Sequence, residues 1–237
     1  HAEKKGLARG IYLLPNLITT GALFSGFYAI VAAMNGSLES AAIAVVIAGF
    51  LDALDGRIAR LTNTQSAFGV QYDSLSDMVA FGVAPAVLMF SWVLSDLGKV
   101  GWMIAFLYVA CAALRLAKFT MAPEHRVFFG LASPGAAGVL ATTVWTWLDN
   151  FNQEVSLQFC IVISIFIITL ALLMVSNVRY YSPKNFNLKG RVPFVYMLIV
   201  VLFFVIVAIY PPGVLLVIGI TYVFSGPIQW VIGRIHR

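Results

Sequence analysis

The sequence predicts an all-α protein that crosses a membrane eight times, and three observations support this fold class. Only 11% of its 237 residues are charged, whereas 61% are hydrophobic. Apolar runs of membrane-spanning length follow one another with short breaks, and the basic residues gather on one side of the resulting topology. A soluble domain carries about 25% charged residues. Lipid must therefore solvate most of this chain, which we expect to form a single membrane domain over residues 1–237.

Eight candidate transmembrane segments follow from the lengths of the apolar runs, since one span of a bilayer takes about 20 apolar residues. Turn-forming or charged residues occupy the breaks: Asn35-Gly36 follows the first run, residues 96–99 follow the third, and residues 211–213 precede the last. Ser133-Pro134 places a proline in the first turn of the fifth segment, where proline is tolerated. The predicted segments are residues 13–34, 38–61, 72–94, 100–119, 132–148, 155–175, 192–210 and 213–232.

The basic residues test this topology through the positive-inside rule. With a cytoplasmic amino terminus and eight alternating spans, every Lys and Arg except Lys99 falls at a cytoplasmic helix end or loop. The outer loops carry acidic residues instead, such as Glu39, Asp96 and Glu154. The net charge of +5 therefore indicates a membrane surface rather than a nucleic-acid partner. We predict that both termini are cytoplasmic and that the protein lies in a bacterial inner (cell) membrane.

Four aspartates stand at the predicted cytoplasmic ends of the second and third segments. They are Asp52, Asp55, Asp73 and Asp77, within 26 positions of one another. Ionisable side chains at membrane depth are costly and usually functional. Carboxylates that lie close together also disfavour each other's ionisation. We therefore expect a cation to neutralise this cluster.

Helical spacing predicts how these acids are arranged. At about 100° per residue, Asp52 and Asp55 share one face of their helix, and Asp73 and Asp77 lie one turn apart on the next. Two helices joined by a short loop pack antiparallel, so the four acids should meet across one groove. Hard oxygen ligands of this kind favour Mg²⁺ or Mn²⁺ over zinc.

The residues between the acids suggest a phosphate-bearing ligand. Gly56 and Gly69 leave room for a ligand to approach the backbone. Arg60, one turn beyond Asp55 and Gly56, can present a planar fork to a phosphate. Purely structural ion pairs fit less well, since Arg57 and Arg60 cannot balance four acids. A cation pathway would spread its acids through the membrane depth instead of placing them at one level.

The acidic stretch resembles the signature of the CDP-alcohol phosphotransferase family, D-x2-D-G-x2-A-R-x8-G-x3-D-x3-D, at every fixed position from Asp52 to Asp77. This resemblance implies a six-helix core, here followed by two C-terminal helices, around a cytoplasm-facing cavity. It also implies two metal ions, a CDP-linked lipid donor and a homodimer. Asp52, Asp55 and Asp73 would hold one ion, and Asp52, Asp73 and Asp77 the other. Asp77 would also be the catalytic base.

The same resemblance assigns residues to the donor lipid, CDP-diacylglycerol. Gly56, Arg60 and Ser66 match family positions that contact it, and Gly69 leaves space beside it. Asn16 and Thr19 match the element of the first helix that lines the same cavity.

Later stretches of the chain resemble the phosphatidylserine synthase branch of this family. They are residues 72–86, 113–119, 130–134 and 174–184, so the resemblance covers about residues 12–190. It implies transfer of a phosphatidyl group from CDP-diacylglycerol to L-serine, with release of CMP. Arg115, Lys118 and Lys184 are candidate partners of the serine carboxylate. Lys118 and Thr120 stand where this branch usually has Arg and Asn.

Several alternatives stay open at this point. Another member of the family would use glycerol phosphate, inositol phosphate or an aminoalcohol as acceptor, although a phosphorylated acceptor would require a denser basic cluster. A divalent-cation transporter could reuse the acids. Basic residues at inner helix ends also set topology and meet anionic lipid headgroups. Neither direct displacement nor a covalent intermediate is indicated by the sequence.

Overall fold

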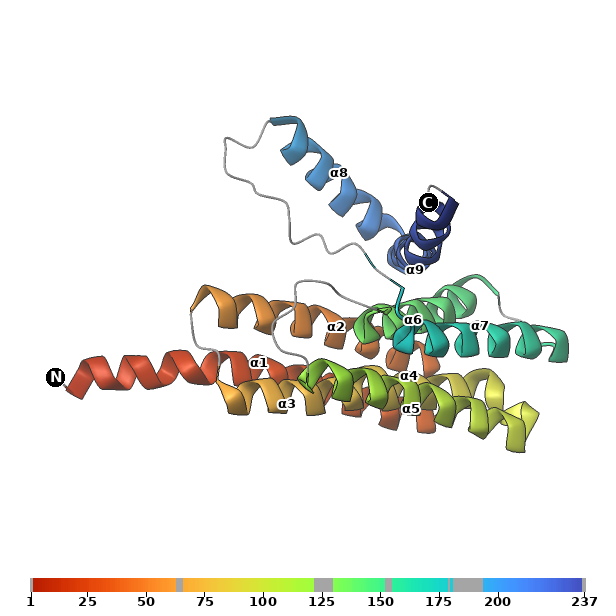
Figure 1. Cartoon of the computed structure of the whole chain (residues 1–237), viewed down its shortest axis with the longest axis horizontal. Coiled ribbons are helices and arrows are strands. Elements are labelled where there is room, and N and C mark those ends of the chain that lie inside the picture. The colour runs from red at the N-terminus through yellow and green to blue at the C-terminus, as the bar shows by residue number, and fades with distance from the viewer. Residues whose placement is uncertain are drawn as a thin grey trace.

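Every regular element that the structure describes is a helix (Figure 1). The computed structural model describes residues 2–62, 66–121, 130–151, 155–178, 180 and 194–235. The α-helices are α1 Ala2–Met34, α2 Leu38–Leu61, α3 Ala67–Asp77, α4 Ala84–Met89, α5 Lys99–Met121, α6 Ser133–Asn150, α7 Leu157–Val175, α8 Phe194–Ile209 and α9 Pro211–Ile235. Between α3 and α5 lie two π-helical stretches, η1 Met78–Val83 and η2 Phe90–Leu94, and a 3-10 turn, η3 Ser95–Leu97.

Five helical segments are long and apolar enough to cross a membrane: Leu14–Met34, Ala67–Leu97, Lys99–Thr120, Leu157–Val175 and Pro211–Trp230. The predicted all-α, multi-pass architecture is therefore confirmed. The count of eight spans stays a prediction, because α2 carries charged residues in its second half, α6 ends in the polar residues Asp149 and Asn150, and α8 has only 16 residues.

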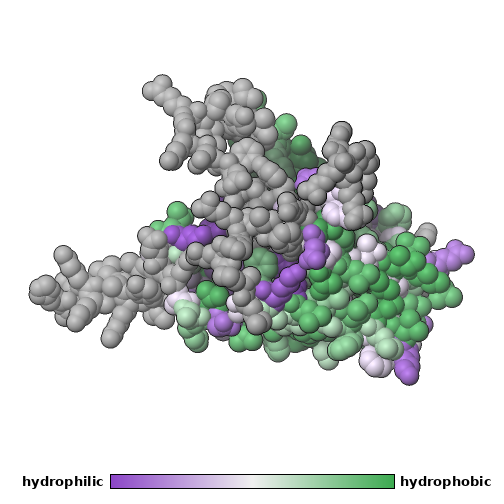
Figure 2. All heavy atoms as spheres, viewed as in Figure 1, coloured by the Kyte–Doolittle hydropathy of each residue, from purple (hydrophilic) through white to green (hydrophobic). Residues whose placement is uncertain are grey.

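Apolar side chains form much of the molecular surface, as the green area at the right of Figure 2 shows. On α7 alone, Val162, Ile165 and Leu172 are each more than half exposed. Water would disfavour a surface of this kind, whereas lipid tails would not. The surface thus agrees with the composition.

Two of the predicted breaks between helices lie where the sequence placed them. Gly36 and Gly98 have positive φ angles of 78° and 55°, which glycine adopts without strain, and they end the first and third helical segments. Helix α6 begins at Ser133 with a proline in its first turn. The break predicted at residues 211–213 lies earlier, at Tyr210, because α9 already begins at Pro211, and proline is tolerated in the first turn of a helix.

The third segment differs from its prediction in length and in geometry. It begins at Ala67 rather than at residue 72, because Ser66 caps it: the Gly69 N–H donates to Ser66 Oγ at 3.0 Å. It then passes through η1, α4 and η2 without leaving the helical region. Pro85 lies in this stretch and has no N–H for the Phe81 carbonyl four residues earlier. Such positions in membrane helices are accommodated by local π adjustments.

The helices assemble around the first three segments. Helix α1 packs against α2 and against the third segment, α2 packs against α6, and α5 packs against α7. Helix α9 rests on α6, and α8 packs against α9, so these two lie to one side of the bundle (Figure 1). Small residues allow close helix approach where lipid supplies no hydrophobic force between helices. The buried alanines with this role include Ala29, Ala33, Ala41, Ala48 and Ala80.

Helix α1 approaches the third segment very closely at Gly26. A Cβ atom there would lie 2.6 Å from the Ala80 Cα. We expect Gly26→Ala to destabilise the protein by about 1–3 kcal/mol, because the two backbones must separate. The measurement is the melting temperature in detergent.

Gly138→Ala is the matched control for this substitution. Gly138 is also inside a helix, and an added Cβ would meet no atom of another described segment within 4 Å. Its melting temperature should stay the same or rise slightly. Equal melting temperatures for both variants would contradict the packing described at Gly26.

Candidate active site

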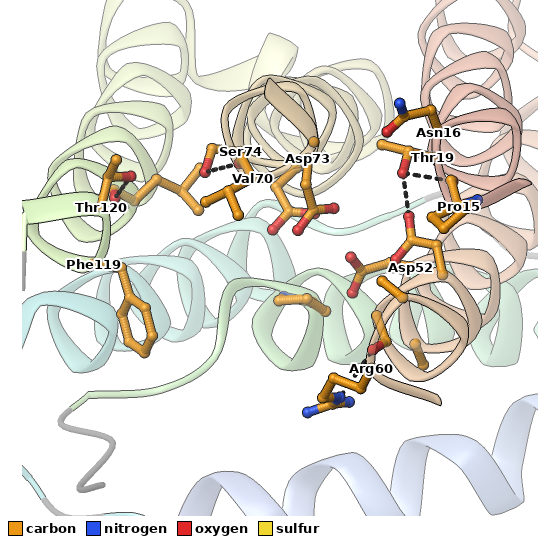
Figure 3. A pocket seen from close by; sticks show the side chains of 18 of the residues that line it. Pro15, Asn16, Thr19, Asp52, Arg60, Val70, Asp73, Ser74, Phe119 and Thr120 are labelled. Atoms are coloured by element: carbon orange, nitrogen blue, oxygen red, sulfur yellow. Dashed lines mark hydrogen bonds between the residues drawn. The ribbon is translucent and has the colours of Figure 1, made fainter. Parts of the chain in front are cut away.

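One cavity of about 550 Å³ brings together the ends of several helices. Helices α1, α2, α3 and α5 form its walls, together with the start of α6 (Figure 3). The lining residues are Pro15, Asn16, Thr19, Asp52, Ala53, Asp55, Gly56, Ala59, Arg60, Ser66, Gly69, Val70, Asp73, Ser74, Asp77, Arg115, Leu116, Phe119, Thr120, Ala132 and Pro134.

The four aspartates converge in this cavity. One carboxylate oxygen from each of Asp52, Asp55 and Asp73 lies within 4.8 Å of the others. Asp77 lines the same cavity and lies next to Asp52. In Figure 3, Asp52 and Asp73 point from facing helices toward the same space. The predicted meeting of the four acids across one groove is therefore observed, but α2 packs against the third segment only beyond Asp77, at η1 and α4, so that α2 and α3 face each other across the cavity.

These side chains fit a divalent cation. The Oδ1 atom of Asp73 is buried and has no hydrogen-bond partner among the described residues. Buried polar atoms normally have a partner, and carboxylates at this spacing repel one another without a cation. Carboxylate oxygens are the ligands that Mg²⁺ and Mn²⁺ prefer. The group of Asp52, Asp55 and Asp73 thus has the chemistry and the spacing to hold such an ion.

Helix α1 orients one of the acids. The Thr19 hydroxyl donates to Asp55 Oδ2 at 2.6 Å and also lies 3.0 Å from the Pro15 carbonyl. Asp55 is only 4% exposed, so this bond fixes the direction of its carboxylate. The Ser76 hydroxyl donates to the Thr19 carbonyl at 3.3 Å and ties α3 to the same turn of α1. Thr19 therefore both lines the cavity and positions an acid.

The two motif glycines meet different surroundings at the rim. A Cβ on Gly69 would lie 3.1 Å from Ser66 Oγ and 3.3 Å from Asn16 Oδ1, which is tighter than ordinary contact. Among the described residues, a Cβ on Gly56 would meet only the Arg60 guanidinium, at 3.9 Å. Glycine is thus needed for packing at position 69. At position 56 its absent side chain leaves cavity space.

Arg60 and Arg115 bring positive charge to the same cavity. Arg60 Nε donates to the Gly56 carbonyl at 2.8 Å, one turn earlier on α2. Arg115, on α5, is 9% exposed and donates from Nη1 to the Ser133 hydroxyl at 2.9 Å. Its Nε is buried and has no hydrogen-bond partner among the described residues. The Arg115 guanidinium also lies 5.2 Å from the centre of the Phe119 ring.

The cavity contains most of the site residues expected from the sequence: Asn16, Thr19, Asp52, Asp55, Gly56, Arg60, Ser66, Gly69, Asp73, Asp77 and Arg115. Lys118 does not line it; this residue is exposed and donates to Asn177 Oδ1 at 3.1 Å. Lys184 lies outside the described residues.

Two contributors to the site were not identified from the sequence. Phe119 forms part of the wall beside Arg115, and the Ser133 hydroxyl is the partner of Arg115. Both stood inside stretches that resemble the phosphatidylserine synthase branch, but only the resemblance marked them. Their contact with Arg115 depends on how α5 and α6 pack, which helical spacing does not specify.

Comparison with known proteins identifies the family. The sequence model of the CDP-alcohol phosphatidyltransferase family matches residues 12–130. A CDP-diacylglycerol–serine O-phosphatidyltransferase of Helicobacter pylori strain J99 is 36% identical over 231 residues, 93% of this chain and 92% of its own. A Methanocaldococcus jannaschii protein with the same name is 36% identical and covers 77% of this chain and 80% of its own. An archaetidylserine synthase of Methanothermobacter thermautotrophicus is 34% identical, covering 70% of this chain and 69% of its own. The four convergent aspartates, the family match and this similarity along nearly the whole sequence agree, and the chain belongs to the CDP-alcohol phosphatidyltransferase family.

Proposed function

We propose that this protein transfers the phosphatidyl group of CDP-diacylglycerol to L-serine and produces phosphatidylserine and CMP. The observation that carries the proposal is the convergence of Asp52, Asp55, Asp73 and Asp77 on one cavity in a member of this family. The names of the three relatives favour serine as acceptor, since all of them contain it. The same names differ in the lipid, so they support the acceptor more directly than the donor.

The acids would hold two divalent ions, Mg²⁺ or Mn²⁺. Asp52, Asp55 and Asp73 would bind one, and Asp52, Asp73 and Asp77 the other. The unpartnered Oδ1 of Asp73 supports this assignment. Such ions supply neutralisation of the pyrophosphate charge and stabilisation of the departing CMP.

Asp77 would act as the general base. Its carboxylate takes the proton of the serine hydroxyl, and the serine oxygen forms a bond to the phosphorus attached to diacylglycerol. The bond between that phosphorus and the oxygen of CMP breaks, and CMP leaves with the electron pair. Asp77 lines the cavity beside Asp52, where an acceptor hydroxyl could approach it. Asn16, Gly56, Arg60, Ser66 and Gly69 would contact the CDP-lipid.

The surroundings of the cavity support a cytoplasmic site near the headgroup plane. Asp52 and Asp55 lie in the C-terminal half of α2, which also carries Arg57 and Arg60. Lys118 lies in the last turn of α5. Basic residues of this kind mark the cytoplasmic side of membrane helices. We propose eight spans with both termini cytoplasmic in a bacterial inner membrane, a six-helix core followed by α8 and α9, one domain over residues 1–237, and a homodimer.

The acceptor is tested by offering purified protein CDP-diacylglycerol with serine, glycerol 3-phosphate, inositol phosphate or ethanolamine in parallel. Release of CMP and formation of the lipid product are measured together. We expect CMP release with serine alone. Turnover with another acceptor and not with serine would overturn the proposal. Metal-dependent flux into liposomes without CMP formation would indicate a transporter instead.

Arg115 is the best-placed partner for the serine carboxylate, since it is buried, lines the cavity and has an Nε donor with no partner in the part of the chain that the structure describes. We expect Arg115→Ala to raise the KM for serine about tenfold or more, because hydrogen bonds to charged groups contribute roughly 1.5–3 kcal/mol. The KM for CDP-diacylglycerol should change little. Steady-state kinetics with each substrate varied in turn measures both values.

Lys118→Ala is the control for this prediction. Lys118 lies one turn further along α5, but its amine bonds to Asn177 outside the cavity lining. We expect both KM values of this variant to match those of the parent protein. A rise in the KM for serine that is equal in the two variants would remove Arg115 from the acceptor site.

A further inference from the structure

The helical segment that carries Asp73 and Asp77 contains a backbone defect directly after them. The Phe81 carbonyl lies one turn beyond Asp77, and the residue whose N–H would pair with it in an α-helix is Pro85, which has none. Phe81 is 1% exposed and Pro85 is also buried. Water cannot reach a carbonyl at this depth, so another donor must satisfy it.

Tyr108 supplies that donor from the neighbouring helix. Its hydroxyl donates to the Phe81 carbonyl at 3.1 Å, and its side chain is completely buried. Helix α5 and η1 also lie close together at Gly82, where an added Cβ would be 3.4 Å from the Ala112 Cβ. Tyr108, Ala112 and Arg115 follow one another along one face of α5. The face of α5 that reaches the cavity at Arg115 therefore also braces η1 at Tyr108.

The state of η1 determines where Asp73 and Asp77 point. A π-helical turn holds one residue more than an α-helical turn. The helix on one side of it is therefore rotated about its axis by about 100° relative to the helix on the other side. Helix α4 is fixed in the core, since Leu88 and Met89 are fully buried. If η1 relaxed to α-helical geometry, the rotation would have to appear in α3. Asp73 and Asp77 would then turn away from Asp52 and Asp55.

We infer that Tyr108 is a positioning residue of the active site: its bond to the Phe81 carbonyl holds the π-helical turn that aims Asp73 and Asp77 at the acids of α2. Tyr108 does not line the cavity, so it acts through the backbone of η1 and not on the substrates. The role of Asp77 in turnover rests on the proposed function. The orientation of Asp73 toward Asp52 and Asp55 does not depend on the proposed function.

The test replaces Tyr108 by Phe, which removes only the hydroxyl. We expect kcat to fall about 10- to 100-fold, since a displacement of about 1 Å in a catalytic group can have that effect. The KM values for serine and CDP-diacylglycerol should stay within about twofold. We also expect the Mn²⁺ concentration that half-saturates the rise in melting temperature to increase about tenfold. This second readout needs no turnover, so it stands even if serine is not the acceptor.

Tyr180→Phe is the matched control. Tyr180 is also buried, and its hydroxyl donates to the Val223 carbonyl of α9 at the same distance, 3.1 Å. This variant loses an equivalent bond away from the acids and should keep the parent kcat and Mn²⁺ dependence. If Tyr108→Phe has a lower melting temperature but keeps the parent kcat and Mn²⁺ dependence, Tyr108 is merely structural and the inference is overturned.

Pro85→Ala provides a second test that does not depend on Tyr108→Phe folding. It restores the N–H at position 85 and thus removes the reason for the π-helical turn. We expect an unchanged or higher melting temperature together with a lower kcat and weaker Mn²⁺ response. Parent values of kcat and of the Mn²⁺ response in Pro85→Ala would contradict the inference.

Discussion

Replacing Asp77 by Asn should lower CMP release by at least about a hundredfold and leave the protein folded. General-base catalysis contributes about 10²- to 10⁴-fold, and the amide cannot accept the serine proton. Asn has nearly the shape of Asp, so the packing around it should persist. The substitution also removes one of four mutually repelling carboxylates. The melting temperature measured in the presence of a chelator should therefore stay the same or rise.

Asp96→Asn is the control for this prediction. Asp96 lies at the opposite end of the same helical segment, is exposed and does not line the cavity. Its rate of CMP release should equal that of the parent protein. Substantial CMP release by Asp77→Asn, measured with CDP-diacylglycerol and serine at saturating concentrations, would remove Asp77 from the role of base.

Removal of divalent ions should stop the reaction and also destabilise the fold. A ligand that binds only the folded state stabilises it by RT ln(1 + [L]/Kd), or about 2.7 kcal/mol at a hundredfold excess over Kd. A chelator should therefore abolish CMP release and lower the melting temperature. Addition of Mg²⁺ or Mn²⁺ should restore both, and the ion that gives the higher rate identifies the better cofactor.

Asp73→Asn connects this effect to the cavity. Asp73 contributes to the only group of potential metal-binding carboxylates found among the described residues, and its Oδ1 has no other partner there. The melting temperature of this variant should respond weakly to added ions, whereas that of Asp96→Asn should respond as the parent does. A parent protein indifferent to chelation in both rate and melting temperature would contradict the metal assignment.

The site was largely predictable because its chemistry is encoded in short helical spacings. Asp52 and Asp55 share a face whatever surrounds them, and so do Asp73 and Asp77, so one short loop between two helices suffices to bring the four together. The same holds for Gly56 and Arg60, one turn apart on α2. The family membership and the all-α fold depend on these local patterns and on the apolar composition.

Features that depend on packing between distant segments were not predictable in this way. Arg115 and Lys118 are three positions apart and therefore lie near each other on α5, yet one turns to Ser133 and the other to Asn177. Spacing along α5 does not reveal which neighbour each one meets. The π-helical turn after Asp77 is likewise decided by two residues that are far apart, Pro85 and Tyr108. A proline alone indicates a missing donor and does not say what replaces it.

The contact at Gly26 has a consequence for how molecules can enter the cavity. With no side chain between the two backbones there, α1 and the third segment cannot slide or tilt independently, and the Ser76–Thr19 bond links them again beside the acids. These two contacts hold α1 and the third segment close together on one side of the cavity. If the cavity widens to admit a nucleotide headgroup, we expect the wall formed by α5 and α6 to move. The Arg115–Ser133 bond joins these two helices beside the cavity.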